Sequence, residues 1–167
     1  MEMEQEEVDK ARTRQRVPVF TTAFIARFQN DPDCVAAETD LDVAVIKRLL
    51  VGEQDTVLAS CTDHLASPHA DPGLPCPASF LSCLDCENAR ALPHQLPVQL
   101  AAAERIAALR PHLDPVVWDT RLRPRLDQLE EIVNTYTAAE REQARREVTS
   151  RQQQMIDEFL EGRWDLR

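Results

Sequence analysis

Apolar residues recur at helical spacing in the first quarter of this chain. In the stretch 17–30 they stand one, three or four positions apart, which predicts a short amphipathic helix that the run 31–33 ends. A second helix is expected after Asp40, whose side chain can cap it, with Gly52 as a natural stop just past its end. The apolar positions of the two helices are Val19, Phe20, Phe24, Ile25 and Phe28, then Leu41, Val45, Ile46, Leu49 and Leu50.

The same spacing returns in the second half of the chain. It predicts one helix over 96–109, which ends before Pro111, and a short helix that Asp114 caps. After Pro124 an apolar stripe predicts another long helix, and Thr137 with Glu140 forms a capping box for the last one. We expect these two segments to form an antiparallel helical hairpin. The stripe is Leu122, Leu126, Leu129, Val133 and Tyr136, and the last helix carries Ala144, Val148, Met155 and Phe159 on one face.

Between the two helical parts lies a stretch of different character, 61–94, which contains five prolines and four of the five cysteines. The first sixteen residues are charged throughout and are typical of a flexible arm. The sequence therefore predicts a mainly α protein with an irregular helical domain and a central Pro/Cys-rich loop. Its expected divisions are an arm over 1–16, N-terminal helices over 17–60, a loop module over 61–94 and a helical region over 95–167.

Charge and composition narrow the function classes. The chain has 167 residues and a formal net charge of −10, whereas proteins that grip nucleic acid are usually basic because phosphate neutralisation supplies most of their affinity. DNA binding is therefore disfavoured. The sequence shows neither a signal peptide nor an apolar run that would span a bilayer, so a cytoplasmic protein without a membrane partner is expected. In that compartment cysteines indicate a metal or free thiols before disulfides.

Four cysteines have a spacing that suits a metal ion: Cys61, Cys76, Cys83 and Cys86. Zinc accepts a tetrahedral set of thiolates, and two cysteines separated by two residues can hold one ion from a single turn. The favoured interpretation is one structural Zn²⁺ that orders the proline-rich loop, because four protein ligands leave no position for a reacting water. Buried thiols that act as small apolar residues, and a disulfide or redox pair, are the alternatives.

Two histidines compete with the cysteines as ligands. His64 follows Cys61 by three residues and is the rival fourth ligand, and His69 is a weaker rival. A site of three cysteines and one histidine would still be closed and structural. Cys34 stands apart from the cluster and is expected to be an ordinary thiol.

The cysteine-rich region resembles a known family. The segments that carry the likeness are 61–69, 72–89 with its Ser79-Phe80-Leu81 and Asn88-Ala89, and 94–99. They are similar to the C-terminal cysteine-rich region of large actinobacterial integrases of the tyrosine recombinase class, over about residues 50–160. The resemblance implies a zinc-binding module that belongs to a mobile element and takes part in DNA recombination. The chain is too short to contain the recombinase domain, and its single tyrosine, Tyr136, lies on an apolar stripe, which favours core packing.

Three functions follow from these features. The first is a non-catalytic zinc-binding accessory protein of an integrase system, which acts on a protein partner such as a recombinase, or assists DNA binding. The second is a helical interaction module in which residues 115–160 pair with a partner helix or form a homodimer, although intramolecular packing is the commoner use of such a stripe. The third is a small DNA-binding regulator. An enzyme is the least supported class, because Asp63, His64 and His69 lack an accompanying nucleophile motif or open metal site. The arginines that would form a basic face are Arg121, Arg123, Arg125, Arg141, Arg145 and Arg146.

Overall fold

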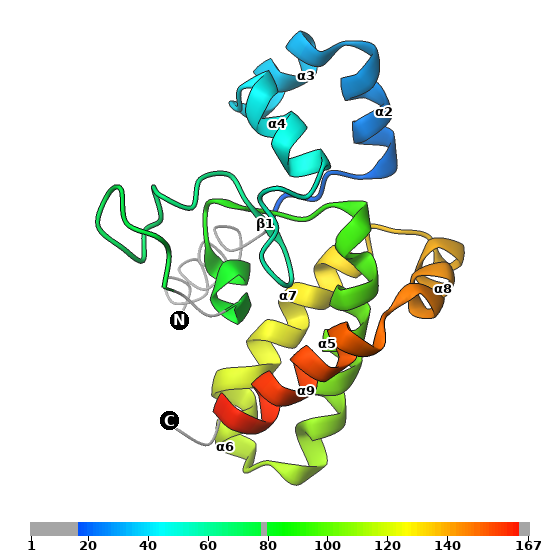
Figure 1. Cartoon of the computed structure of the whole chain (residues 1–167). Helices are drawn as coiled ribbons and strands as arrows, with labels where there is room; N and C mark the ends of the chain where they lie inside the picture. Colours follow the sequence, from blue (N-terminus) through cyan, green and yellow to red (C-terminus); the bar gives the residue numbers. More distant parts are fainter. Residues whose placement is uncertain (1–16, 78–79, 164–167) are drawn as a thin grey trace, which may run out of the picture. The chain divides into compact units, whose positions relative to one another are not determined.

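The structure is a computed structural model that describes residues 17–77 and 80–163. The described chain is mainly helical, as the sequence predicts. It divides into two compact units, the first ending at Pro93 and the second beginning at His94 (Figure 1). The predicted arm over 1–16 lies outside the described residues. Among the residues described, no helix is both long and apolar enough to cross a membrane.

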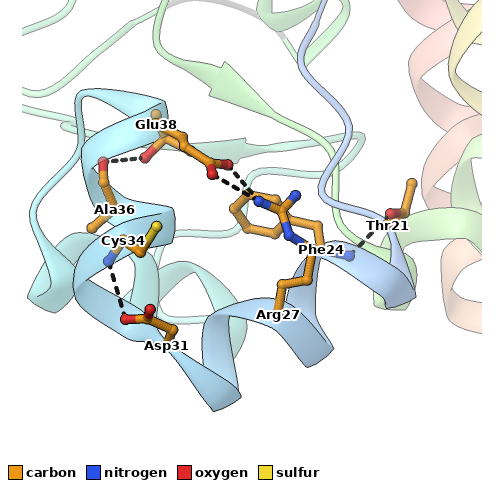
Figure 2. Close-up of polar contacts among 8 residues, drawn as sticks. Thr21, Phe24, Arg27, Asp31, Cys34, Ala36 and Glu38 are labelled. Carbon is orange, nitrogen blue, oxygen red and sulfur yellow. Dashed lines mark hydrogen bonds and ion pairs between the residues drawn. The ribbon is translucent and has the colours of Figure 1, made fainter.

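The first unit begins with three short helices: α2 (Thr22–Asn30), α3 (Pro32–Thr39) and α4 (Val43–Leu50). The predicted helix over 17–30 begins later than expected. Thr21 caps α2 by accepting a hydrogen bond from the Phe24 backbone N–H at 3.2 Å (Figure 2), so the helix cannot extend back past it, and the residues before it are extended.

The helix α3 was not predicted, and it changes the role of Asp40. Pro32 does not only end α2 but also opens α3, where a proline is tolerated because no intrahelical N–H is needed. Asp40 was expected to cap the start of the next helix. It instead terminates α3 in the left-handed conformation, with φ of 56°, which short polar residues adopt more readily than others. Gly52, at φ 82°, follows the end of α4 as predicted.

The three helices enclose a small core. One cluster joins Phe28, Val35, Ala36 and Ile46 from all three helices. A second joins Phe20 and Leu49 to Leu92, which comes from the far end of the unit's sequence. The Phe20 ring stacks on Phe24 with centroids 4.1 Å apart. Phenylalanine and aliphatic side chains therefore share the core of this unit.

Residues 51–93 complete the first unit with little regular structure. Strands β1 (Ser60–Cys61) and β2 (Ala89–Arg90) form a two-stranded antiparallel sheet, and η1 (Phe80–Asp85) is a 3₁₀-helix. The stretch 54–60 is a turn closed by an isolated bridge between Asp55 and Ser60. The loop is tied to the N-terminal helices through Ala91, whose carbonyl accepts a hydrogen bond from the Phe20 N–H at 2.8 Å.

The second unit is built from helices joined by short connections. Leu96–Leu109 is helical as predicted, and Asp114 caps the next helix by accepting from the Val116 N–H at 2.8 Å. A π-helical segment precedes Pro124, whose ring nitrogen has no hydrogen to donate to the preceding turn. The elements are η2 (Pro93–Gln95), α5 (Leu96–Leu109), η3 (Arg110–His112), α6 (Pro115–Val117), η4 (Trp118–Leu122), α7 (Arg123–Val133), α8 (Ala138–Glu147) and α9 (Ser150–Arg163).

The central helix of this unit is α5. Helices α7, α8 and α9 all pack against it, and most of its residues are buried. Two ion pairs reinforce the packing at the surface: Arg105 with Asp157 of α9, and Arg145 of α8 with Glu104, both at 3.0 Å. Ion pairs this exposed to solvent contribute little to stability, so apolar burial dominates.

The predicted last helix is in fact two. The capping box of Thr137 and Glu140 opens α8 as expected. The chain then breaks at 148–149, where Thr149 and Gln152 form a second reciprocal pair of capping hydrogen bonds, at 3.0 and 3.1 Å. The break rotates the following face, so the buried residues of α9 are Ile156 and Leu160, whereas Met155 is 38% exposed. Of the predicted apolar face, Ala144 is buried as expected and Val148 and Phe159 are half-buried, whereas the inward position predicted for Met155 was wrong.

Candidate metal centre

The four cysteines predicted as ligands all lie in the irregular part of the first unit. Cys61 ends β1 and is buried. Cys76 lies in the proline-rich loop, Cys83 lies within η1, and Cys86 directly follows η1. The Cys86 N–H donates to the Cys83 carbonyl at 3.1 Å, which closes the tight turn that a Cys-x2-Cys pair needs to reach one ion.

Strand pairing brings Cys61 close to this turn. Cys61 is opposite Ala89 in the sheet, and the Ala89 N–H donates to the Cys86 carbonyl at 3.1 Å. Next to the strands, the Thr62 N–H donates to the Asn88 carbonyl at 2.9 Å. The Asn88 side chain in turn donates to the Ala66 carbonyl at 3.0 Å. A network of backbone and amide hydrogen bonds therefore fixes the loop after Cys61 against the loop after Cys86.

The cysteines lie within range of one another's charge. Burial raises the pKa of the Cys61 thiol, a backbone hydrogen bond at Asp63 opposes this, and the charges of the other three cysteines raise the pKa further. Burial likewise raises the pKa of Cys83, a side-chain hydrogen bond with Thr56 opposes it, and Cys86 and Cys76 add to it. Four neighbouring thiolates repel one another, so a bound dication would favour their ionised form.

Two polar side chains accompany the cysteines. Ser67 is 8% exposed, and its hydroxyl donates to the Cys76 Sγ at 3.1 Å. Arg90 donates from Nη1 to the carbonyls of Glu87 and Ala89, both at 2.8 Å. Burial lowers the pKa of Arg90, and the charges of Cys61 and Cys86 raise it, which places a cation near two of the thiols. Sequence reasoning missed both residues, because neither stands at a recognisable spacing from a cysteine.

The donor set suits zinc by its chemistry, since four thiols are soft ligands of the type that structural zinc sites use. Within residues 17–77 and 80–163, however, no three His, Cys, Asp or Glu side chains are grouped so that they could already hold a metal ion. The charges of the cysteines thus act on one another, but the side chains are not arranged as a complete coordination shell. Of the rival ligands, His64 is half-buried and His69 is exposed.

The fifth cysteine is separate, as expected. Cys34 lies in the first turn of α3 and is exposed, and its backbone N–H donates to the Asp31 carboxylate at 3.4 Å (Figure 2). On the neighbouring helix, Arg27 makes a two-pronged ion pair with Glu38, at 2.6 and 2.9 Å. The surroundings of Cys34 are therefore those of a surface helix with ordinary caps and pairs.

The arginines considered as a DNA-binding face are largely engaged within the second unit. Arg145 pairs with Glu104 and Glu142, Arg146 also reaches Glu142, and Arg123 pairs with Asp119. Arg141 donates to the backbone carbonyl at position 136, at 2.7 Å. Carboxylates therefore lie beside Arg123, Arg145 and Arg146, whose side chains remain exposed.

Tyr136 is buried in the second unit, 4% exposed. Burial, and to a lesser extent the charge of Glu140, raises its pKa to about 12. Its position agrees with the core packing that the apolar stripe favoured. Among catalytic candidates, Asp63 accepts a hydrogen bond from the Leu65 backbone N–H at 2.9 Å, a turn-forming contact.

Comparison with known protein families, with characterised proteins and with solved structures finds no match to this chain. Its function is therefore inferred from the cysteine-rich region itself.

Proposed function

We propose that Cys61, Cys76, Cys83 and Cys86 hold one structural Zn²⁺ and that this protein is a non-catalytic accessory of an integrase or mobile-element system. The observation that supports the zinc proposal is the influence of the cysteines on one another: the charges of Cys76, Cys83 and Cys86 act on Cys61, and those of Cys76 and Cys86 act on Cys83. A bound dication would be stabilised by each thiolate that ligates it.

The surrounding fold supports a structural role for the ion. In the part of 51–93 that the structure describes, regular structure is confined to β1 and β2, of two residues each, to η1 and to the first residue of η2, and the other backbone hydrogen bonds are separate turn and loop contacts. Binding of zinc supplies on the order of 10 kcal/mol in small zinc modules at neutral pH. Here that free energy would go into fixing the loop against β1 and β2. Four protein ligands would leave no open position on the metal, which agrees with a site without catalysis.

The zinc proposal is tested by metal content and by matched cysteine variants. Protein purified without added metal should contain one zinc per chain by mass spectrometry of the metal. Cys83→Ser should lose it, while Cys34→Ser, at the exposed cysteine outside the cluster, should keep it. His64→Ala distinguishes the rival ligand, because only a site that uses this histidine would lose affinity. A wild-type chain free of zinc, or a Cys83→Ser variant that retains full stoichiometry, would contradict the proposal.

The accessory role rests on the resemblance of the cysteine-rich segments and on the charge of the chain. A net charge of −10 disfavours direct binding to DNA, so protein contact is the favoured mode. Zinc-loaded protein should comigrate on size exclusion with a purified tyrosine recombinase encoded beside its gene. Binding to duplex DNA alone should be weak at physiological salt. Failure to form that complex, together with tight salt-dependent DNA binding, would replace the protein partner by DNA.

A further inference from the structure

The inference concerns what surrounds the four cysteines, and it rests on the proposed zinc site. Metal-binding side chains are commonly held by a second layer of hydrogen bonds that fixes their orientation and tunes their charge. In this protein two residues occupy such positions: Ser67, whose hydroxyl donates to the Cys76 Sγ, and Arg90, which follows Ala89, the strand partner of Cys61 and the hydrogen-bond partner of the Cys86 carbonyl.

The hydrogen bonds of Ser67 define the direction of its hydroxyl. The His69 backbone N–H can only donate, and it reaches the Ser67 Oγ at 3.0 Å. The hydroxyl therefore accepts on that side, and its own hydrogen is available for the Cys76 Sγ at 3.1 Å. Ser67 is one of few buried polar residues in the first unit. A buried hydroxyl needs a hydrogen-bond partner, and the Cys76 sulfur provides one for Ser67. The same hydrogen bond would stabilise Cys76 as a thiolate.

Arg90 supplies a positive charge to the ligand set, which a neutral hydrogen-bond donor such as a hydroxyl does not carry. A zinc ion with four thiolates carries a net charge of about −2, which is costly to hold in a partly buried loop. The guanidinium of Arg90 is half-buried and is anchored through the Glu87 and Ala89 carbonyls, which belong to the segment just after Cys86. Backbone carbonyls leave its full positive charge unneutralised. That charge is therefore available to the neighbouring thiolates.

We propose that Ser67 and Arg90 are positioning residues of the zinc site: Ser67 orients Cys76 as a thiolate, and Arg90 offsets the negative charge of the ligand set beside Cys61 and Cys86. Together they would slow the release of zinc and favour four-thiolate coordination. Neither residue contacts the metal. Both act through the cysteines.

The test uses the full chain and measures zinc affinity by competition with a chromogenic chelator. Ser67→Ala and Arg90→Gln should each weaken zinc binding about 10- to 100-fold, the usual effect of losing an outer-shell partner. Ser67→Thr and Arg90→Lys, which keep the hydroxyl and the charge, should recover most of the affinity. Ser150→Ala, in the second unit, and Arg48→Gln, in α4, alter exposed residues and should bind zinc as the wild type does.

A spectroscopic measurement separates this role from general destabilisation. With Co²⁺ in place of zinc, the sulfur-to-metal charge-transfer bands of Ser67→Ala should move to longer wavelength, because a hydrogen bond to sulfur makes its electrons harder to remove. Circular dichroism of each variant checks that the helices persist. If the wild type binds one zinc but Ser67→Ala and Arg90→Gln keep its affinity and its bands, the positioning role of these two residues is overturned and the zinc site itself is not. A wild type that binds neither Zn²⁺ nor Co²⁺ would overturn the zinc site itself.

Discussion

The two units of this protein reach order by different means. In the second unit the long helix α5 is buried by α7, α8 and α9, and aliphatic residues such as Ile106, Leu129 and Ile156 fill the core. In the first unit three short helices form small clusters of phenylalanine and aliphatic side chains, and a stretch of more than forty residues, 51–93, follows with little regular structure in its described part.

The difference shows where each unit finds its stability. Fixing the backbone of one residue costs roughly 1–2 kcal/mol of conformational entropy. Long helices offset that cost through repeated hydrogen bonds and a continuous apolar face. Residues 51–93 have neither, and between the buried residues of 58–61 and of 89–92 the described residues that are buried are Ser67 and Leu84. An ordered loop of this kind needs a further source of stability, which is the reason for assigning it a metal.

Removal of zinc should therefore give the largest difference in stability between the two units. We expect a zinc chelator to cost the first unit on the order of 10 kcal/mol, enough to unfold residues 51–93. Hydrogen exchange measured by mass spectrometry should show loss of protection there, while α5, α7 and α9 keep theirs. The Cys34→Ser variant should respond as the wild type does. Equal loss of protection in both units, or none in either, would contradict a loop-specific role for the metal.

The core of the second unit should respond to cavities and not to metal. Ile156→Ala removes a side chain that is 1% exposed and should destabilise this unit by about 2–5 kcal/mol in denaturant unfolding. Met155→Ala, at the adjacent exposed position, should change stability by about 0.5 kcal/mol or less. Zinc content should be the same in both variants. The opposite order would restore the face that periodicity predicted, with Met155 inward.

Alkaline pH gives a probe of the second unit alone, because Tyr136 is the chain's single tyrosine. Its pKa is raised to about 12, chiefly by burial, so the folded state disfavours the ionised phenol. The resulting stability is complete below the ordinary pKa near 10 and is lost as pH rises toward 12, on the order of 3 kcal/mol in all.

Absorbance of the phenolate should report this shift directly. A spectrophotometric titration should place the midpoint well above that of the unfolded chain in denaturant. Chelation of zinc should leave the midpoint unchanged if the units are independent in stability. An ordinary midpoint near 10 in the native protein would show that Tyr136 is accessible to solvent.

The smallest expected effect concerns the break between α8 and α9. Thr149→Ala removes a capping hydroxyl and should destabilise the second unit by about 1 kcal/mol, with faster hydrogen exchange in the first turn of α9. Thr137→Ala at the start of α8 is the matched variant and should cost a similar amount. If the segment were one continuous helix, Thr149→Ala would be slightly stabilising, because alanine favours helix interiors.

The sequence alone determined those elements whose signals lie within a few residues. The helix 96–109 follows from its apolar spacing and from Pro111, and the capping box of Thr137 follows from one hydroxyl and one carboxylate three positions on. Gly52 marks the end of α4 for the same local reason. The prediction that four cysteines form one module also used only their spacing, and it stays a prediction.

Tertiary structure decided what depends on distant residues. The pairing of Cys61 with Ala89 and of Phe20 with Ala91 joins segments far apart in the chain, which no local pattern encodes. Ile156 is buried because the helix breaks at Thr149. The sequence does carry a signal for that break, a threonine three residues before Gln152, but the apparent apolar period outweighed it in the prediction. The placement of Ser67 and Arg90 beside the cysteines likewise arises only when the loop closes, because hydrogen bonds and charges act through space and not along the sequence.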